Sequence, residues 1–141
     1  MPPAKPVELS VVDTNQGEWD IMPIPYIDAH LEHKALHNDA ETGMMVLKMT
    51  YRAGFTNPWH SHLCGHGFYV LDGVLDTHQG RYGAGSWVWF PEGGTMYHGA
   101  TADEDVTFLF ITNKKFSIHF VGDERDPCAL EMAAVDMQMK G

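Results

Sequence analysis

A chain of 141 residues is the size of one domain with a sizeable core, and we expect no second domain. Its nine basic and 19 acidic side chains give a net charge of −10, which leaves no basic footprint for nucleic acid or for an anionic membrane surface. No stretch approaches about 18 uninterrupted apolar residues and the N-terminus lacks the apolar centre of a signal peptide, so a cytoplasmic location is expected.

Residues 1–40 are rich in proline and are predicted to form an arm with one short strand over residues 8–12. An arm of this kind can pack on a second copy of the chain, and we expect a homodimer. His30, His33 and His37 have a spacing that would place them on one face of a helix, as a second metal site. The polar residues around them fit an exposed turn or strand as well.

The segments after residue 40 alternate between apolar and polar residues, which predicts β-strands. Residues 68–71 and 74–77 flank Asp72-Gly73, the strongest hairpin signal in the sequence, and His78 in the following turn is expected to face solvent. Before them, residues 44–51 are predicted to be a strand with these residues toward the core: Met45, Leu47, Met49 and Tyr51.

Three further strands are predicted over residues 86–90, 106–112 and 116–121. After them Asp126 can cap a final helix, with Pro127 at its first position. The apolar stripe of this helix would be formed by Leu130, Ala133, Ala134 and Met137. Many short strands and a single helix predict an all-β antiparallel sandwich or barrel.

Four histidines form the main candidate site. His60 and His62 are two residues apart, so they point to the same face of an extended strand. His66 can join them if the strand bends at Gly65, and a later strand would return His98 to the same cavity. A lone histidine on an apolar strand is usually a hydrogen-bonded core or rim residue. Several imidazoles converging on one point instead predict a metal site.

The pattern around the first three histidines resembles a known motif. From Gly54 to Gly73 the chain reads G-x5-H-x-H-x3-H-x6-G, which resembles the first motif of the cupin superfamily. In that motif the position of His66 is usually Glu. The resemblance extends over about residues 40–122, which is most of the chain.

The second cupin motif has a looser counterpart. Gly85-x5-Pro91-x-Gly93 is followed by His98, with two more residues before the histidine than the usual pattern and no counterpart of its closing Asn. Small single-domain cupins that cleave β-diketones or hydroxyacetophenones with iron and O2 are the most similar group, including a His-Gly pair, here His98-Gly99. Cupin polyketide cyclases with a four-histidine zinc site are the other similar group.

The resemblance implies an all-β, single-domain cupin jelly-roll sandwich or barrel with a C-terminal helix. The arm would cover residues 1–40, the barrel 41–126 and the helix 127–141. It also implies one divalent metal ion per chain, with Fe2+ and Zn2+ as the leading candidates and Ni2+ also compatible with imidazole. The expected metal ligands are His60, His62, His66 and His98.

Imidazole ligands are neutral, so a divalent metal keeps its full double positive charge. This charge stabilises the enolate of a bound 1,3-dicarbonyl or hydroxyketone, which therefore loses its acidic proton more easily. Three ligands on iron leave positions for the enolate and O2, as in a C–C-cleaving dioxygenase, which we place first. Four ligands suit an aldol-type cyclisation on zinc. A cupin that only binds a metal or a small molecule is the third hypothesis.

The substrate is expected to be small and apolar or aromatic, because the residues around the histidines are mostly aromatic or thioether. The expected pocket residues are Phe55, Trp59, Phe68, Trp87 and Met96. The polar side chains that could move a proton or orient an oxygen are Tyr69, Tyr97, Glu92 and Arg52. Ordinary rim roles fit these four residues as well.

Overall fold

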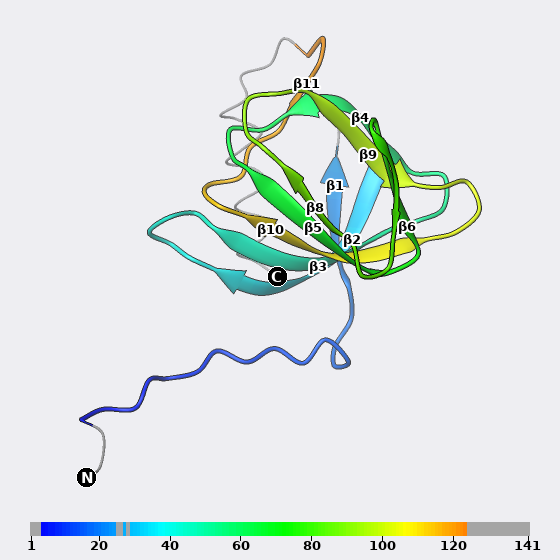
Figure 1. Cartoon of the computed structure of the whole chain (residues 1–141). Coiled ribbons are helices and arrows are strands. Elements are labelled where there is room, and N and C mark those ends of the chain that lie inside the picture. Colours follow the sequence, from blue (N-terminus) through cyan, green and yellow to red (C-terminus); the bar gives the residue numbers. More distant parts are fainter. Residues whose placement is uncertain (1–3, 25–26, 28, 124–141) are drawn as a thin grey trace.

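The structure is a computed structural model that describes residues 4–24, 27 and 29–123. All regular elements in these residues are β-strands, arranged in two antiparallel sheets that face each other (Figure 1). Among them there is no helix long and apolar enough to cross a membrane. Two facing sheets of short antiparallel strands form a jelly roll, so the predicted all-β fold is confirmed.

The larger sheet contains, in spatial order, β1 (Asp20–Ile24), β2 (Ala29–Asn38), β3 (Met45–Tyr51), β10 (Val106–Thr112), β5 (His66–Asp72) and β8 (Trp87–Phe90). The smaller sheet contains β11 (His119–Phe120), β4 (Thr56–Ser61), β9 (Met96–Ala100), β6 (Val74–Thr77) and β7 (Gly80–Gly83). Apart from β1-β2-β3 and β6-β7, neighbouring strands of the two sheets are distant in the sequence.

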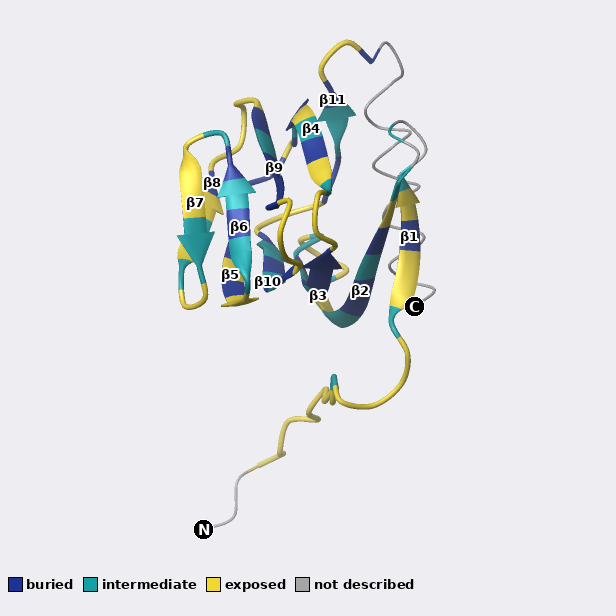
Figure 2. Cartoon of the chain, turned by 90° about the vertical axis from the view of Figure 1, so that its right-hand side faces the viewer, coloured by how far each residue is buried: buried dark blue, intermediate teal, exposed yellow. Residues whose placement is uncertain are grey.

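The core lies between the sheets, where alternate residues of the strands are buried (Figure 2). The register of β3 and β10 places Phe108 opposite Met49 and Phe110 opposite Leu47. Such cross-strand pairs of aromatic and aliphatic side chains stabilise a sheet by about 0.2–1 kcal/mol each. The predicted inward residues of β3 are all buried: Met45, Leu47, Met49 and Tyr51.

The N-terminal region differs from the prediction. Residues 8–12 form no strand, and β1 and β2 form a hairpin that extends the larger sheet. The boundary at residue 40 therefore does not coincide with the sheet edge. The three N-terminal histidines lie on strand β2, where His33 is buried and His30 and His37 are exposed, so the helical alternative is wrong. Pairing with β1 and β3 overrides the helix propensity of this Ala- and Leu-containing segment.

The predicted hairpin at Asp72-Gly73 is also wrong. β5 pairs with β10 and β8, whereas β6 pairs with β9 and β7, so the chain passes from one sheet to the other at this turn. Gly73 has a φ of 83°, and a Cβ there would lie 2.2 Å from the carbonyl oxygen of Asp105. Glycine is required at this corner, but turn chemistry does not show which strand lies beyond it.

Near the C-terminus, the predicted strand over residues 116–121 is reduced to β11. The predicted helix over residues 127–141 lies outside the described residues.

A turn within the predicted arm, at residues 13–17, follows the extended residues 4–12 and is fastened to the outer face of the larger sheet. Nζ of Lys48 on β3 donates to the side-chain oxygen of Thr14 at 3.2 Å. Lys34 is its cross-strand neighbour on β2, so the two amino groups hold the turn from adjacent strands. Nζ of Lys34 donates, at 2.9, 3.0 and 3.1 Å respectively, to the carbonyl oxygens of Thr14, Gln16 and Gly17.

Candidate metal centre

The fold brings the four predicted histidines into the space between the sheets. His60 lies near the end of β4, His62 follows that strand, His66 begins β5 and His98 lies at the middle of β9. All four are buried, and none is more than 4% exposed. A register shift between Asn57 and His60 bends β4 against β9, so both of these side chains are buried although they are three positions apart.

Three of the histidines form one group. One ring nitrogen each of His60, His62 and His98 lies within 4.8 Å of the others, and the Nε2 atoms of His60 and His98 are 3.1 Å apart. Two nitrogens held about 2.1 Å from one ion, at roughly 90–110°, would be about 3.0–3.4 Å apart. The separation of His60 and His98 therefore fits two ligands of one metal ion.

Hydrogen bonds at Nδ1 orient the rings of His60 and His62. Nδ1 of His60 lies 2.5 Å from the carbonyl oxygen of Pro58, and Nδ1 of His62 donates to the carbonyl oxygen of Ser117. A carbonyl oxygen only accepts, so both rings carry their proton on Nδ1 and present an Nε2 lone pair. Nε2 of His62 is buried and has no hydrogen-bond partner within the described part of the chain. An unsatisfied lone pair of this kind is what a metal ion would occupy.

Tyr51 orients the third ring. Its hydroxyl lies 3.1 Å from Nδ1 of His98, and the two rings are stacked with an interplanar angle of 3°. The sequence placed Tyr51 only in the core. Alternation along β3 shows that this tyrosine points inward, but its contact with His98 depends on how the two sheets face each other.

Burial keeps the site neutral. Loss of hydration lowers the pKa of His60 to about 4 and that of His66 to about 3. The same cause, followed by repulsion from the neighbouring imidazoles, lowers the pKa values of His62 and His98 well below 6.5. Neutral imidazole is the form that binds a metal, so the site is ready for one at neutral pH.

His66 lies beside the three-histidine group. Its ring centroid is 4.4 Å from that of His62, and its ring stacks on Phe90 at 4.9 Å. Neither ring nitrogen has a hydrogen-bond partner in the residues described. It therefore lacks the orienting hydrogen-bond partner that the other three histidines have. The donor set of His60, His62 and His98 fits a divalent ion that accepts imidazole, such as Zn2+, Fe2+ or Ni2+.

A pocket of about 210 Å³ lies between the four histidines and the outside of the β6–β9 region, and its lining residues do not include His60, His62, His66 or His98. Its walls come from β6, β7, β8 and β9 and from the turns between them. Apolar and aromatic side chains supply much of the lining, as a pocket for a small apolar ligand requires. Three lining residues are direct neighbours of a site histidine: Thr77 of His98, Met96 of His60, and Phe90 of His66.

His78 lines this pocket, contrary to the prediction that it faces solvent. It is half-buried, and its ring centroid lies 5.5 Å from that of Trp59 and 6.0 Å from that of Tyr97. Its Nδ1 is buried without a hydrogen-bond partner among the residues described. The turn residues around it suggested exposure, but this turn contributes Thr77, His78 and Gln79 to the lining of the pocket.

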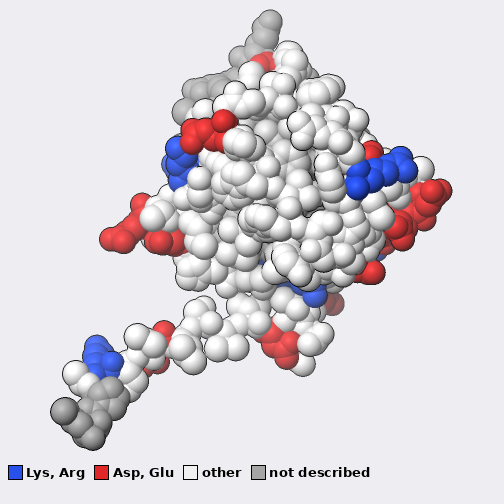
Figure 3. Space-filling view, viewed as in Figure 1, with Lys and Arg blue, Asp and Glu red and all other residues white. Residues whose placement is uncertain are grey.

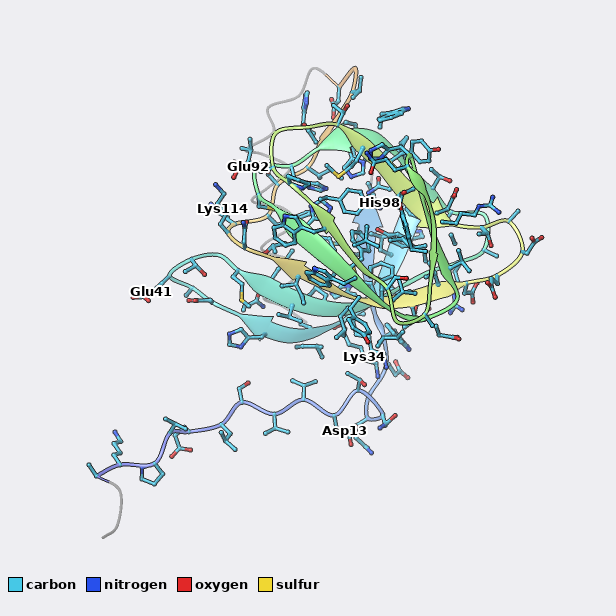
Figure 4. The ribbon with its side chains drawn as sticks, in the orientation of Figure 1. Asp13, Lys34, Glu41, Glu92, His98 and Lys114 are labelled. Carbon is cyan, nitrogen blue, oxygen red and sulfur yellow. The ribbon has the colours of Figure 1, made fainter. Side chains whose placement is uncertain are left out.

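Two of the four polar candidates are held in exposed ion pairs. Arg52 donates to both carboxylate oxygens of Glu32 and, at 2.8 Å, to Asp105. Glu92 lines the pocket and pairs with Lys114 at 2.7 Å. In Figure 4 Glu92 and Lys114 lie at the periphery, whereas His98 lies inside the barrel.

The two tyrosine candidates point away from the histidines. Tyr69 is 42% exposed on the outer face of β5. Tyr97 alternates with His98 along β9, and its ring lies 5.1 Å from that of Trp59.

The predicted pocket residues occupy three different environments. Met96 lines the pocket, and Phe68 is fully buried against the histidines. Phe55 is half-buried. Trp59 and Trp87 are 47% and 51% exposed, because they alternate with inward-facing residues on their strands.

Comparison with known proteins agrees with this architecture. A cupin-like protein of unknown function from Ralstonia eutropha aligns with a TM-score of 0.73 and 16% identity, over 98% of this chain and 89% of that one. A putative acetylacetone dioxygenase from Methylibium petroleiphilum aligns with a TM-score of 0.67 and 18% identity, over 90% of each chain. The polyketide cyclase RemF from Streptomyces resistomycificus aligns with a TM-score of 0.57 and 20% identity, over 69% of this chain and 75% of RemF.

None of the curated protein sequences matches the chain. Residues 7–117, however, match the family described as the ChrR cupin-like domain. This match covers residues 7–40 of the predicted arm, the two motif regions, and His60, His62, His66 and His98. The chain therefore belongs to the ChrR cupin-like domain family.

Proposed function

We propose that this protein is a mononuclear-metal enzyme that cleaves a C–C bond of a small apolar or aromatic 1,3-dicarbonyl or hydroxyketone through its enolate, using Fe2+ and O2. The observation that carries the proposal is the group of His60, His62 and His98, whose rings are fixed at Nδ1. A divalent ion bound there would act as a Lewis acid toward the substrate oxygens. Three protein ligands leave coordination positions for small molecules, which favours this reaction over one with four ligands.

The pocket supports a small, uncharged substrate. Its lining includes Phe90, whose ring stacks on that of His66, and Met96, which is the cross-strand partner of His60. On the face of the molecule drawn in Figure 3 the charged side chains lie at the margins, and the lining of the pocket includes the carboxylate of Glu92. The similarity to a putative acetylacetone dioxygenase supports the same substrate class.

We assign His78 as the residue that takes the acidic proton of the substrate. The hydroxyl of Thr77 donates to the carbonyl oxygen of Gly80 and accepts from the backbone N–H of Gln79, so it is occupied within its own turn. Glu92 is neutralised by Lys114. His78 presents a buried Nδ1 that makes no hydrogen bond to any described residue, and it lines the pocket. An imidazole nitrogen so placed is within reach of a ligand in the pocket and can accept a proton from it.

A zinc-dependent aldol-type cyclase is the second candidate. His66 lies next to His62, and both of its nitrogens are without a described partner, so rotation of its ring would supply a fourth ligand. The similarity to RemF favours the same alternative. A cupin that binds metal without turnover is the third candidate, and it predicts stoichiometric metal with no reaction.

The test combines metal analysis with oxygen uptake. Protein purified without chelator, and protein reconstituted anaerobically with Fe2+ or Zn2+, would be given acetylacetone or 2-hydroxyacetophenone in an oxygen electrode. We expect about one metal ion per chain and one O2 consumed per diketone with iron only. His98→Ala should lose both the metal and the uptake, whereas His30→Ala, on the exposed face of β2, should retain both.

Stoichiometric metal without oxygen uptake in the iron protein would contradict the dioxygenase and favour the cyclase or the binding protein. Equal metal loss in His30→Ala and His98→Ala would move the metal site away from the barrel.

A further inference from the structure

Two connecting segments of the chain lie against each other beside the three-histidine group. Residues 62–65 join β4 to β5 and begin with His62. Residues 113–118 join β10 to β11. Strand β11 pairs with β4, and the two lie side by side in Figure 1, which brings the second segment next to the first. The segment that carries His62 is therefore in contact with a loop from a distant part of the sequence.

Ser117 holds the first segment at two points. Its carbonyl oxygen accepts the Nδ1 proton of His62, and its hydroxyl oxygen accepts the backbone N–H of Leu63 at 3.0 Å. Ser117 is only 1% exposed. The ring of Phe116, its neighbour in the loop, lies 5.0 Å from the His62 ring. One buried residue thus fixes both the imidazole and the backbone that follows it.

Asn113 holds the other end of the segment. Its side-chain Oδ1 accepts the backbone N–H of Gly65 at 3.0 Å, and its own backbone N–H donates to the carbonyl oxygen of Gly65 at 3.1 Å. A side chain at Gly65 has no room, because a Cβ there would lie 2.5 Å from the Trp89 ring and 3.1 Å from Nδ2 of Asn113. The bend that leads from His62 into β5 is therefore closely held.

The position of His62 depends on these contacts. Its Nε2 is buried without a hydrogen-bond partner among the described residues, so the ring is held from the Nδ1 side and through its backbone. The carbonyl group of Ser117 sets the direction of the ring. The side-chain oxygens of Ser117 and Asn113 set where that carbonyl lies relative to the backbone of residues 62–65. A site residue has to be held within about 0.5 Å of its productive position.

We propose that Asn113 and Ser117 are positioning residues of the metal centre, which keep Nε2 of His62 directed toward a metal ion shared with His60 and His98. Their side-chain oxygens bond to the backbone of residues 62–65, so they act through His62. The inference rests on the metal site of the proposed function, and it does not depend on which reaction that metal supports.

The metal affinity of the full chain tests the proposal. Ser117→Ala and Asn113→Ala should each bind Zn2+ about 10–100-fold more weakly than the wild type in competition with a chelator, the usual cost of losing a contact that orients a ligand. The visible absorption bands of the Co2+-loaded protein should shift in both variants, because these bands depend on the arrangement of the ligands. Asn113→Asp keeps the accepting oxygen and should restore the wild-type affinity and spectrum.

The matched control lies at the other end of β10. Oδ1 of Asp105 accepts the backbone N–H of Ala53 at 2.8 Å, just as Oδ1 of Asn113 accepts that of Gly65. Asp105→Ala removes a contact of the same kind, about 26 Å along the chain from Asn113. It should lower the midpoint of urea unfolding but leave the Zn2+ affinity and the Co2+ spectrum unchanged.

The metal-free protein provides a second readout. With nitrogen-15-labelled histidine, the Nδ1 proton of His62 should exchange with water faster in Ser117→Ala and Asn113→Ala than in the wild type or Asp105→Ala. Asn113 is exposed, so its variants keep the test available if the buried Ser117→Ala does not fold.

Two kinds of failure can be told apart. A wild type that binds no Zn2+ would overturn the metal site and the positioning role together. A wild type that binds Zn2+ would overturn the positioning role alone under either of two results: the alanine variants at Asn113 and Ser117 match its affinity and proton exchange, or Asp105→Ala loses as much affinity as they do.

Discussion

The hydroxyl of Tyr51 on β3 lies 3.1 Å from Nδ1 of His98 on β9, so a hydrogen bond between the two sheets orients one of the three clustered imidazoles. The equivalent contacts of the other two rings are made to backbone carbonyl groups. The tyrosine is therefore the orienting partner that a point mutation can remove.

Tyr51→Phe should weaken metal binding by about 10–100-fold, the usual effect of losing a hydrogen bond that orients a ligand. The phenyl ring fills the same space, so the fold should persist. Affinity can be measured by competition with a chromogenic chelator. Tyr69→Phe is the matched control, because its hydroxyl is on the outer face of β5. Equal affinities in the two variants would remove Tyr51 from the site.

His66→Phe distinguishes three metal ligands from four. The His66 ring is surrounded by Phe90, Phe68 and Phe110, at centroid distances of 4.9, 5.6 and 5.3 Å, so a phenyl ring should fit there. If three histidines bind, this variant keeps about one metal ion per chain, and removal of two unpartnered buried nitrogens does not destabilise it. Loss of the metal by elemental analysis would show that His66 is a ligand.

Gly94→Leu should block the pocket in which we propose that the substrate binds. Gly94 lines the pocket, and a Cβ there would meet no atom within 4 Å, so the added side chain should enter the pocket without strain. We expect kcat/KM for acetylacetone to fall at least about tenfold while the metal content is unchanged. Gly83→Leu is the control, because Gly83 also has open space but is not part of the lining. Similar losses in both variants would place the substrate elsewhere.

The metal-free protein should lose stability as the pH falls from about 6.5 toward 4. The pKa values of His60 and His66 are lowered from 6.5 to about 4 and about 3, so the unfolded chain binds more protons in this range. Each such histidine contributes full stability above about pH 6.5 and then loses up to about 1.4 kcal/mol per pH unit. Urea unfolding in EDTA at pH 7.5 and pH 5.0 measures this. Equal midpoints at the two pH values would contradict the burial of neutral histidines.

In the metal-bound protein, the free energy of unfolding should fall more steeply as the pH is lowered. Protons and the ion compete for the same lone pairs, so affinity should also fall below about pH 6. A metal affinity that is constant from pH 8 to pH 5 would contradict a site made of several histidines.

The sequence predicted the parts of the site that depend on local geometry. The spacing of two residues predicted that His60 and His62 face the same way, the loose second motif predicted that His98 joins them, and the three lie in one group in the structure. The hydrogen bond from Tyr51 and the position of His78 at the pocket could not be predicted, because both depend on contacts between strands distant in the sequence.

The errors at the N-terminus and at Gly73 have the same origin. Residues of β2 have the composition of a helix and form a strand only because β1 and β3 pair with it. Gly73 makes a tight turn in either topology, and only the sheet to which β6 belongs shows that it is a corner. The fold class follows from strand periodicity and turn spacing, whereas strand pairing is a property of the whole chain.

Strand β5 carries a site histidine and core residues on its inner face, and an exposed tyrosine and leucine on its outer face. His66, Phe68 and Val70 are buried, whereas Tyr69 and Leu71 face outward. Deleting a single residue from this strand would exchange the two sets, exposing histidine and phenylalanine and burying the tyrosine hydroxyl. Point substitutions in β5 can alter one face and spare the other, but an insertion or deletion cannot. During evolution this segment is therefore expected to change in sequence without changing in length.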